Sequence, residues 1–202
     1  MSYITESGIP DLGKIPWSTH FCQLYSSKDD LAQSLIPYFI AGLTNDEQCI
    51  WVTSQPYNVE NAAADFKKSF PGFGAAIKEG RLKILDYSEW YTNAGWLDGK
   101  ITEHWLDEER RSLSEGFEGL RISGNTSFVS APAWDAFMRY EREIHETLKG
   151  RRILALCSYN ITEIEPTNVF EMIRAHEFSI HRNNGFWEIL ETGGYFSSIK
   201  SY

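Results

Sequence analysis

The sequence predicts a single α/β domain of three layers, in which helices cover both faces of a mainly parallel, doubly wound sheet. Strand patterns and helix patterns alternate from residue 19 to residue 191, and this βαβ alternation is typical of parallel sheets. The segments 49–52 and 153–157 are continuous apolar runs, as expected for strands that are covered on both faces. A chain of 202 residues is long enough for one such domain with a full core.

Six segments are predicted to be strands. They are short and rich in apolar and β-branched residues, and turn-forming residues flank most of them. The sixth is expected at an edge of the sheet. The six segments are Thr19–Tyr25, Gln48–Thr53, Arg81–Asp86, Gly119–Ser123, Ile153–Tyr159 and Gly185–Leu190.

Five helices are predicted between or after these strands. In the first, apolar residues recur four apart from Leu31 to Leu43, which places them on one helical face. Asp29 or Asp30 is expected to cap its start. The fourth opens with Pro132 in its first turn. The five helices span Lys28–Gly42, Val59–Phe70, Lys100–Gly116, Pro132–Lys149 and Pro166–Ser179.

The two ends of the chain are predicted to lie outside the domain. Residues 1–18 are expected to be a loose leader, because Gly8, Pro10, Gly13 and Pro16 interrupt any regular pattern. The domain is therefore placed at 19–191, and residues 192–202 are expected to be a tail or linker.

Composition excludes several classes of function. The net charge is −9 and the arginines at 110–111 and 151–152 are isolated pairs, so direct binding of nucleic acid is not expected. No apolar run approaches the length of a membrane span, and the N-terminus has no signal-peptide pattern. Three widely spaced cysteines with no Cys-x-x-Cys pair favour reduced thiols and a cytoplasmic protein.

The first turn from strand to helix, residues 25–29, contains no glycine. A loop that cradles phosphate needs glycines for close backbone approach, followed by a Lys-Ser or Lys-Thr pair. Neither Gly13-Lys14 nor Gly99-Lys100 is followed by a hydroxyl residue. ATP hydrolysis is therefore not expected.

The first predicted strand carries His20 and Cys22, which share one face because side chains alternate along a strand. Imidazole and thiolate are good ligands for zinc, iron or copper, and they could equally line a small-molecule pocket. Both could also be ordinary core residues. A closed metal site would need further donors, for which Cys157, His176 and His104 are the candidates.

Charged residues near other strand ends are weaker candidates. Arg121 could place its charge over a pocket, or it could pair with Glu141 in the following helix. Asp86 closes the third strand, where a carboxylate can face the cleft or cap a helix. The chain has 12 Phe, 10 Tyr and 7 Trp residues, which suit either a pocket wall or a dense core.

Several of these motifs together resemble the MEDS domain, the methanogen/methylotroph DcmR sensory domain. The resemblance covers roughly residues 17–180, and its first motif, His20–Tyr25, is the most specific. The other matching segments are Gly42-Leu43, Glu47–Val52, Gly119–Gly124, Tyr140-Glu141, Ala155–Tyr159 and His176.

The resemblance implies a non-catalytic prokaryotic signal-input domain that senses a simple hydrocarbon or one-carbon derivative. It implies a signalling partner such as a histidine kinase module or a DNA-binding domain, in a stand-alone or an excised chain, and we add a homodimer as an expectation. The strand plan also resembles that of RecA/KaiC ATPases without the phosphate loop, and in that plan the strand of Cys157 lies beside the first strand.

These implications predict a pocket over the carboxyl ends of the first, fourth and fifth strands. A metal or haem sensor, a scaffold for protein contacts and an enzyme with an activated Cys22 thiol remain alternatives. The expected ligand-binding residues are His20, Cys22, Tyr25, Arg121, Cys157 and Tyr159, and the expected ligands of a metal ion or haem are His20, Cys22, Cys157 and His176.

Overall fold

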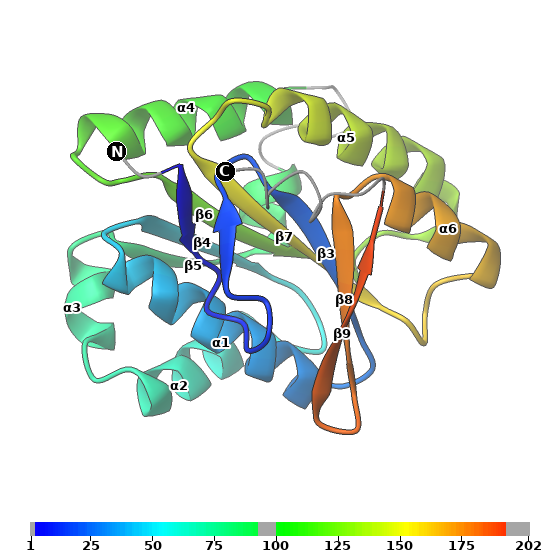
Figure 1. The fold of residues 1–202 in the computed structure, drawn as a ribbon, viewed down its shortest axis with the longest axis horizontal. Helices are drawn as coiled ribbons and strands as arrows, with labels where there is room; N and C mark the ends of the chain where they lie inside the picture. The colour runs from blue at the N-terminus through cyan, green and yellow to red at the C-terminus, as the bar shows by residue number, and fades with distance from the viewer. Residues whose placement is uncertain (1–2, 93–99, 193–202) are drawn as a thin grey trace.

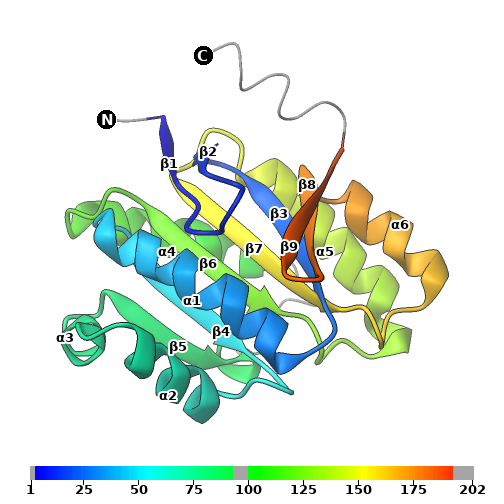
Figure 2. The ribbon, with the colours of Figure 1, turned by 60° about the horizontal axis from the view of Figure 1, so that its bottom comes forward.

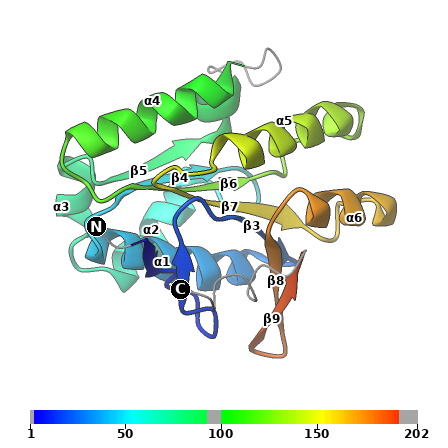
Figure 3. The same cartoon turned by 45° about the horizontal axis from the view of Figure 1, so that its top comes forward.

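The computed structural model describes residues 3–92 and 100–192, and it confirms the predicted three-layer α/β fold. The central sheet has seven strands in the order β5-β4-β6-β7-β3-β8-β9. Helices α1 and α2 cover one face of this sheet, and α4 and α5 cover the other, with α6 beside α5 (Figures 1 and 3).

Six neighbouring strands of this sheet, β5 to β8 in spatial order, run parallel, and only β9 is antiparallel to its neighbour. The first five predicted strands form where the sequence places them, with β5 at one edge of the sheet, and the sixth is β9 at the other edge. The strands are β3 (His20–Tyr25), β4 (Gln48–Thr53), β5 (Leu82–Asp86), β6 (Leu120–Asn125), β7 (Ile153–Asn160), β8 (Phe178–Asn183) and β9 (Phe186–Glu191).

The predicted helices also form, but their ends differ from the predicted ones. The last helix stops at Arg174, and Phe178 and Ser179 begin β8, which adds a strand beside β3 that the helical pattern concealed. A short α3 was not predicted, since Gly72 and Gly74 flank its first residue. The helices are α1 (Lys28–Thr44), α2 (Val59–Ser69), α3 (Phe73–Lys78), α4 (Ile101–Ser114), α5 (Trp134–Thr147) and α6 (Pro166–Arg174).

The N-terminal segment has regular structure, so the prediction of a loose leader is wrong. Strands β1 (Ile4–Glu6) and β2 (Lys14–Pro16) pair antiparallel. Gly8 and Gly13 make the turn possible, because both have a positive φ that other residues rarely adopt. Trp17 follows the hairpin and is buried. The predicted tail lies outside the described residues from residue 193 onward.

Buried apolar residues form a cluster on each side of the sheet, and the alternation along each strand decides which cluster a residue joins. Phe21 packs toward α1, whereas Cys22 belongs to the cluster under α4, α5 and α6. Figure 2 shows α1 lying across the first of these faces. In the described part of the chain, no helix combines the length and the apolar character needed to cross a bilayer.

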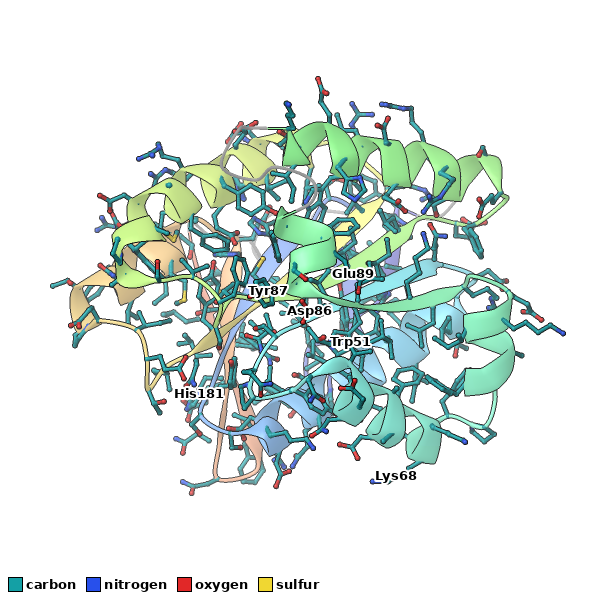
Figure 4. The ribbon with its side chains drawn as sticks, turned by 180° about the vertical axis from the view of Figure 1, so that it is seen from behind. Trp51, Lys68, Asp86, Tyr87, Glu89 and His181 are labelled. Atoms are coloured by element: carbon teal, nitrogen blue, oxygen red, sulfur yellow. The ribbon has the colours of Figure 1, made fainter. Side chains whose placement is uncertain are left out.

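Asp86 ends β5 and shapes the turn that follows it. Its carboxylate accepts hydrogen bonds from the Ser88 amide and hydroxyl, at 3.0 and 2.6 Å, just before the π-helical turn Ser88–Thr92. Figure 4 shows Asp86 beside Tyr87 and Glu89 at this end of the strand. The Asp86 carboxylate therefore caps the start of this turn.

Candidate functional site: a buried His-Glu-Cys-His cluster

Four buried side chains with metal-ligating atoms meet between the sheet and the helices on its α5 face. His20 is the first residue of β3, and Cys157 lies on the adjacent strand β7. Glu141 projects from α5, and His176 lies in the turn between α6 and β8. The structure therefore brings together His20, Cys157 and His176, three of the four residues named as possible metal ligands, from separate parts of the chain.

Glu141 is the centre of this cluster. Its Oε2 atom lies 3.2 Å from His20 Nε2, 3.4 Å from His176 Nε2 and 3.6 Å from Cys157 Sγ. His20 Nε2 and Cys157 Sγ are 3.4 Å apart. All four donor atoms lie within 4.8 Å of one another, so they surround a single point.

These spacings suit a four-coordinate metal ion. Ligands at metal bond lengths of about 2.0–2.3 Å in a regular tetrahedron are about 3.3–3.8 Å apart. Four of the six separations among these atoms run from 3.2 to 3.6 Å, and all six are within 4.8 Å. Two imidazoles, a thiol and a carboxylate are ligand types that zinc and related transition metals accept.

Burial and mutual charge set the protonation of the cluster. Burial, reinforced by the charge of His176, lowers the pKa of His20 to about 4, so this imidazole is neutral. Burial alone would raise the pKa of Glu141, but hydrogen bonds and charges from His176 and His20 lower it well below its usual range. Burial opposes the charge on His176, yet Cys22, Cys157 and Glu141 raise its pKa well above the usual value.

The metal-free cluster therefore holds a Glu141 carboxylate beside a His176 imidazolium. Burial, with the Glu141 charge adding to it, raises the pKa of Cys157 to about 12, so its thiol keeps the proton. With neutral His20, the four side chains carry no net charge. The proton on His176 thus balances the charge of the Glu141 carboxylate, as a bound cation would.

Two backbone contacts orient the imidazoles. His176 Nδ1 lies 2.7 Å from the Met172 carbonyl oxygen, so this nitrogen donates and Nε2 faces the cluster. The backbone N–H of His20 donates to Glu177 Oε2 at 2.8 Å. Three cluster atoms, His20 Nδ1, His176 Nε2 and Glu141 Oε1, have no hydrogen-bond partner in the described part of the chain, although His176 Nε2 lies 3.4 Å from Glu141 Oε2.

Glu141 was missed as a site residue, although the sequence contains a signal for it. On α5 the buried positions include Phe137, Met138 and Ile144, and Glu141 lies among them on the same apolar face. A carboxylate at such a position needs a compensating partner. The sequence analysis offered Arg121 as one possible partner, but Arg121 pairs with Glu47 instead.

Arg121 lies on the opposite face of the sheet and takes no part in the cluster. Its neighbour Ile122 faces α5, so alternation along β6 directs Arg121 toward α1. There Arg121 binds Glu47 at 2.5 and 3.0 Å and donates to three backbone carbonyls, those of Glu6, Ser7 and Tyr38.

Cys22 and Tyr159 border the cluster without being among its four donors. Cys22 pairs in register with Cys157 across β3 and β7, and it interacts electrostatically with His176. The Tyr159 ring lies 5.8 Å from the His176 ring. Glu141 thus holds the place in the donor set that the sequence analysis gave to Cys22. His104, a further candidate, lies on α4 and packs instead against Trp90 of the π-helical turn.

The predicted pocket over the carboxyl ends of the strands does not unite the expected residues, because His20 lies at the amino end of β3. At the carboxyl ends, the Tyr25 hydroxyl bonds Asn125 and Ser127. A cavity of about 100 Å³ lies there, lined in part by Ser127, Trp134 and Asn160. Neither this cavity nor one of about 470 Å³ near the N-terminal hairpin is lined by the four cluster residues.

The turn after β3 is occupied by a carboxylate of the chain itself. Asp30 Oδ2 accepts hydrogen bonds from the amides of Ser26 and Ser27, both at 3.0 Å, and from the Ser26 hydroxyl at 2.9 Å. Ser27 is the N-cap of α1, so the prediction that Asp29 or Asp30 caps this helix is corrected to a capping box between Ser27 and Asp30.

Comparisons with known proteins agree with this architecture. The sequence profile of the MEDS family, "MEthanogen/methylotroph, DcmR Sensory domain", matches residues 19–177. No curated protein matches the chain.

Two similar solved structures show the fold. A KaiC-like protein from Pyrococcus horikoshii OT3 has a TM-score of 0.58 and 14% identity, covering 92% of this chain and 85% of its own. The flagellar accessory protein FlaH from Methanocaldococcus jannaschii has a TM-score of 0.54 and 14% identity, covering 94% and 85%. The RecA/KaiC-like plan predicted from the sequence is therefore confirmed.

Proposed function

Because this chain belongs to the MEDS family of sensory domains, we propose that it is a non-catalytic signal-input domain whose input depends on a transition-metal ion. The ion would be held by His20, Glu141, Cys157 and His176. The observation that supports this most is the convergence of four donor atoms of three chemical types within 4.8 Å, at separations that suit a tetrahedral ion.

The donor set favours a single ion over haem. If two imidazoles were axial ligands of a haem iron, the porphyrin would fill the plane between them. Glu141 Oε2 and Cys157 Sγ lie 3.2 and 3.4 Å from His20 Nε2, in the space that such a ring would need. A zinc-like ion needs no more room than these four atoms already enclose.

Metal binding at the cluster would stabilise the packing of α5 and α6 against the sheet. The four ligands come from β3, β7, α5 and the turn after α6. An ion bound to all of them ties both helices to the sheet. A ligand shifts an equilibrium only by its differential affinity, so the signal would be the difference between tied and untied α5 and α6.

A second candidate input is a small organic molecule, of which the family resemblance suggests a one-carbon or simple hydrocarbon derivative. The cavity of about 100 Å³ at the carboxyl ends of β6 and β7 supports this candidate. Its size limits the ligand to a few atoms, since pockets for drug-sized molecules are about 300–1,000 Å³. In either case the output would pass to a signalling partner, for which a kinase module or a DNA-binding domain is the proposal.

A thermal-shift experiment on chelator-stripped protein tests the metal proposal. Zn²⁺ at 100 times its Kd should stabilise the wild type by about 2.7 kcal/mol, which raises Tm. His20→Ala should lose this shift. His104→Ala is the matched control, because His104 is half-buried on a helix of the same face yet lies outside the four-donor group, and it should keep the shift.

The same assay separates the candidates. A rise in Tm with one-carbon compounds but not with metals would favour the organic ligand, and Trp134→Ala should then remove it. Equal Zn²⁺ shifts for the wild type and His20→Ala would refute the metal proposal.

A further inference from the structure

We propose that His145 and Glu177 form a transfer site through which the metal ion passes between solvent and the buried cluster. The proposal rests on the metal-dependent function above, and it adds a second, weaker metal site that the cluster itself does not include. It predicts a role in the rate of metal loading and not in the final affinity.

The pair lies directly against the cluster. His145 follows Glu141 by one turn of α5, and its ring centroid is 5.8 Å from that of His20. Glu177 follows His176 in sequence, and its Oε2 accepts the His20 backbone N–H at 2.8 Å. His145 Nδ1 and Glu177 Oε2 are 3.7 Å apart, close enough for one ion to contact both.

The pair also reaches solvent, whereas the cluster does not. The side chains of His145 and Glu177 are 25% and 20% exposed. Those of His20 and Glu141 are 0% and 1% exposed. An ion at the cluster is therefore sealed from water. An ion at His145 would be partly open to solvent and would also lie next to His20 of the cluster.

The chemistry of the pair fits transfer and not permanent binding. One imidazole and one carboxylate supply two ligands, and stable zinc sites have four protein ligands or three with a water. The neighbouring Lys149 would repel a cation, but its ammonium is held by Glu146 at 2.6 Å. His20 Nδ1 has no hydrogen-bond partner in the described residues. Rotation of the imidazole about the Cβ–Cγ bond therefore breaks no hydrogen bond of that nitrogen.

Metal loading followed with Co²⁺ tests this inference, because thiolate-bound Co²⁺ absorbs visible light and its arrival can be timed by stopped-flow. Loading of chelator-stripped wild type is compared with His145→Ala, His145→Gln and Glu177→Gln. Glu177→Gln keeps an oxygen for the His20 amide. The matched control is Asp135→Asn, which removes one carboxylate charge from the exposed first turn of α5 and leaves both the pair and the contact between Glu146 and Lys149 in place. Circular dichroism and Tm establish that each variant is folded.

We expect His145→Ala and Glu177→Gln to slow both loading and release by the same factor, about tenfold, with Kd unchanged. Equal effects on both rates are required because a residue on the path alters the barrier and not the end states. Loading rates like those of wild type would overturn the inference. So would a weaker Kd caused by faster release alone, which would make the pair an outer support of the ligands. If wild-type protein binds no Co²⁺, Zn²⁺ or other transition metal, the proposed function itself fails.

Discussion

Among the described residues, each face of the sheet has one carboxylate that is fully buried, and these two are compensated in different ways. Glu47, under α1, receives two bonds from the Arg121 guanidinium and one from the Thr5 hydroxyl at 2.6 Å. Glu141, under α5, meets two imidazoles and a thiol through one oxygen, and its other oxygen has no hydrogen-bond partner in the described chain.

The difference separates a structural ion pair from a candidate binding site. Arg121 cannot give up its proton, and its remaining N–H groups are bound by backbone carbonyls, so the Glu47 site is saturated. The protons around Glu141 are on groups that can lose them, and an ion can replace them. Four variants or conditions would sharpen or break this comparison.

The largest effect is expected for Arg121→Met. The substitution leaves Glu47 buried without its partner, and breaking a buried pair in this way costs about 3–5 kcal/mol. Urea denaturation of the metal-free protein measures the loss. The double variant Glu47→Gln/Arg121→Met should recover part of it, because the uncompensated charge is gone. If Arg121→Met lowers the free energy of unfolding by less than about 1 kcal/mol, the charge of Glu47 does not depend on Arg121 for compensation.

Glu141→Gln is expected to affect metal binding more than folding. The change removes a direct ligand, so Zn²⁺ affinity should fall by at least about 100-fold, the upper end of what loss of an outer-shell partner costs. The metal-free protein should lose less stability than Arg121→Met does, because His176 can release its proton when the carboxylate is gone. Competition with a chromogenic chelator measures the affinity. Similar affinities for wild type and variant would exclude Glu141 from the site.

Metal affinity should rise steeply with pH. Between pH 6 and 8 the metal-free cluster carries one proton on His176, whose pKa is raised, and one on Cys157, whose pKa is about 12. Both protons must leave when an ion binds, while His20, with a pKa of about 4, is already neutral. Release of about two protons gives about a 100-fold change in affinity per pH unit. Calorimetry in buffers of different ionisation enthalpy counts the protons, and a count near zero would contradict the protonation scheme.

The smallest effect is expected for Cys22→Ser. Cys22 is next to Cys157 in register but outside the group of four donors, so Zn²⁺ affinity should change by only about 2–3-fold, whereas Cys157→Ser should lower it by at least about 100-fold. Cys49→Ser supplies the matched control, since Cys49 is an equally buried thiol on the other face. A large loss with Cys22→Ser would restore Cys22 as a ligand.

Strands β3 to β7 and the proximity of His20, Cys157 and His176 could be predicted because they depend on local apolar runs and on a family resemblance. The partner of Arg121 could not, because whether Arg121 meets Glu47 or Glu141 depends on which face of β6 it occupies. The N-terminal hairpin was hidden because Gly8 and Gly13 are equally common in loops and in turns that pair strands. Strand β8 was hidden because its short pattern, Phe178 to Ile180, also continues the preceding helical one.

Asp30 has a consequence for any phosphorylated compound that meets this fold. Amides at the start of a helix are where such folds ordinarily take an anion, and here the carboxylate that fills them is covalently tethered three residues away. A free anion must compete for these amides with the Asp30 carboxylate, whose effective concentration is at least in the millimolar range because it is part of the same chain. We therefore expect nucleotides to bind weakly at this turn, because they would have to displace the Asp30 carboxylate.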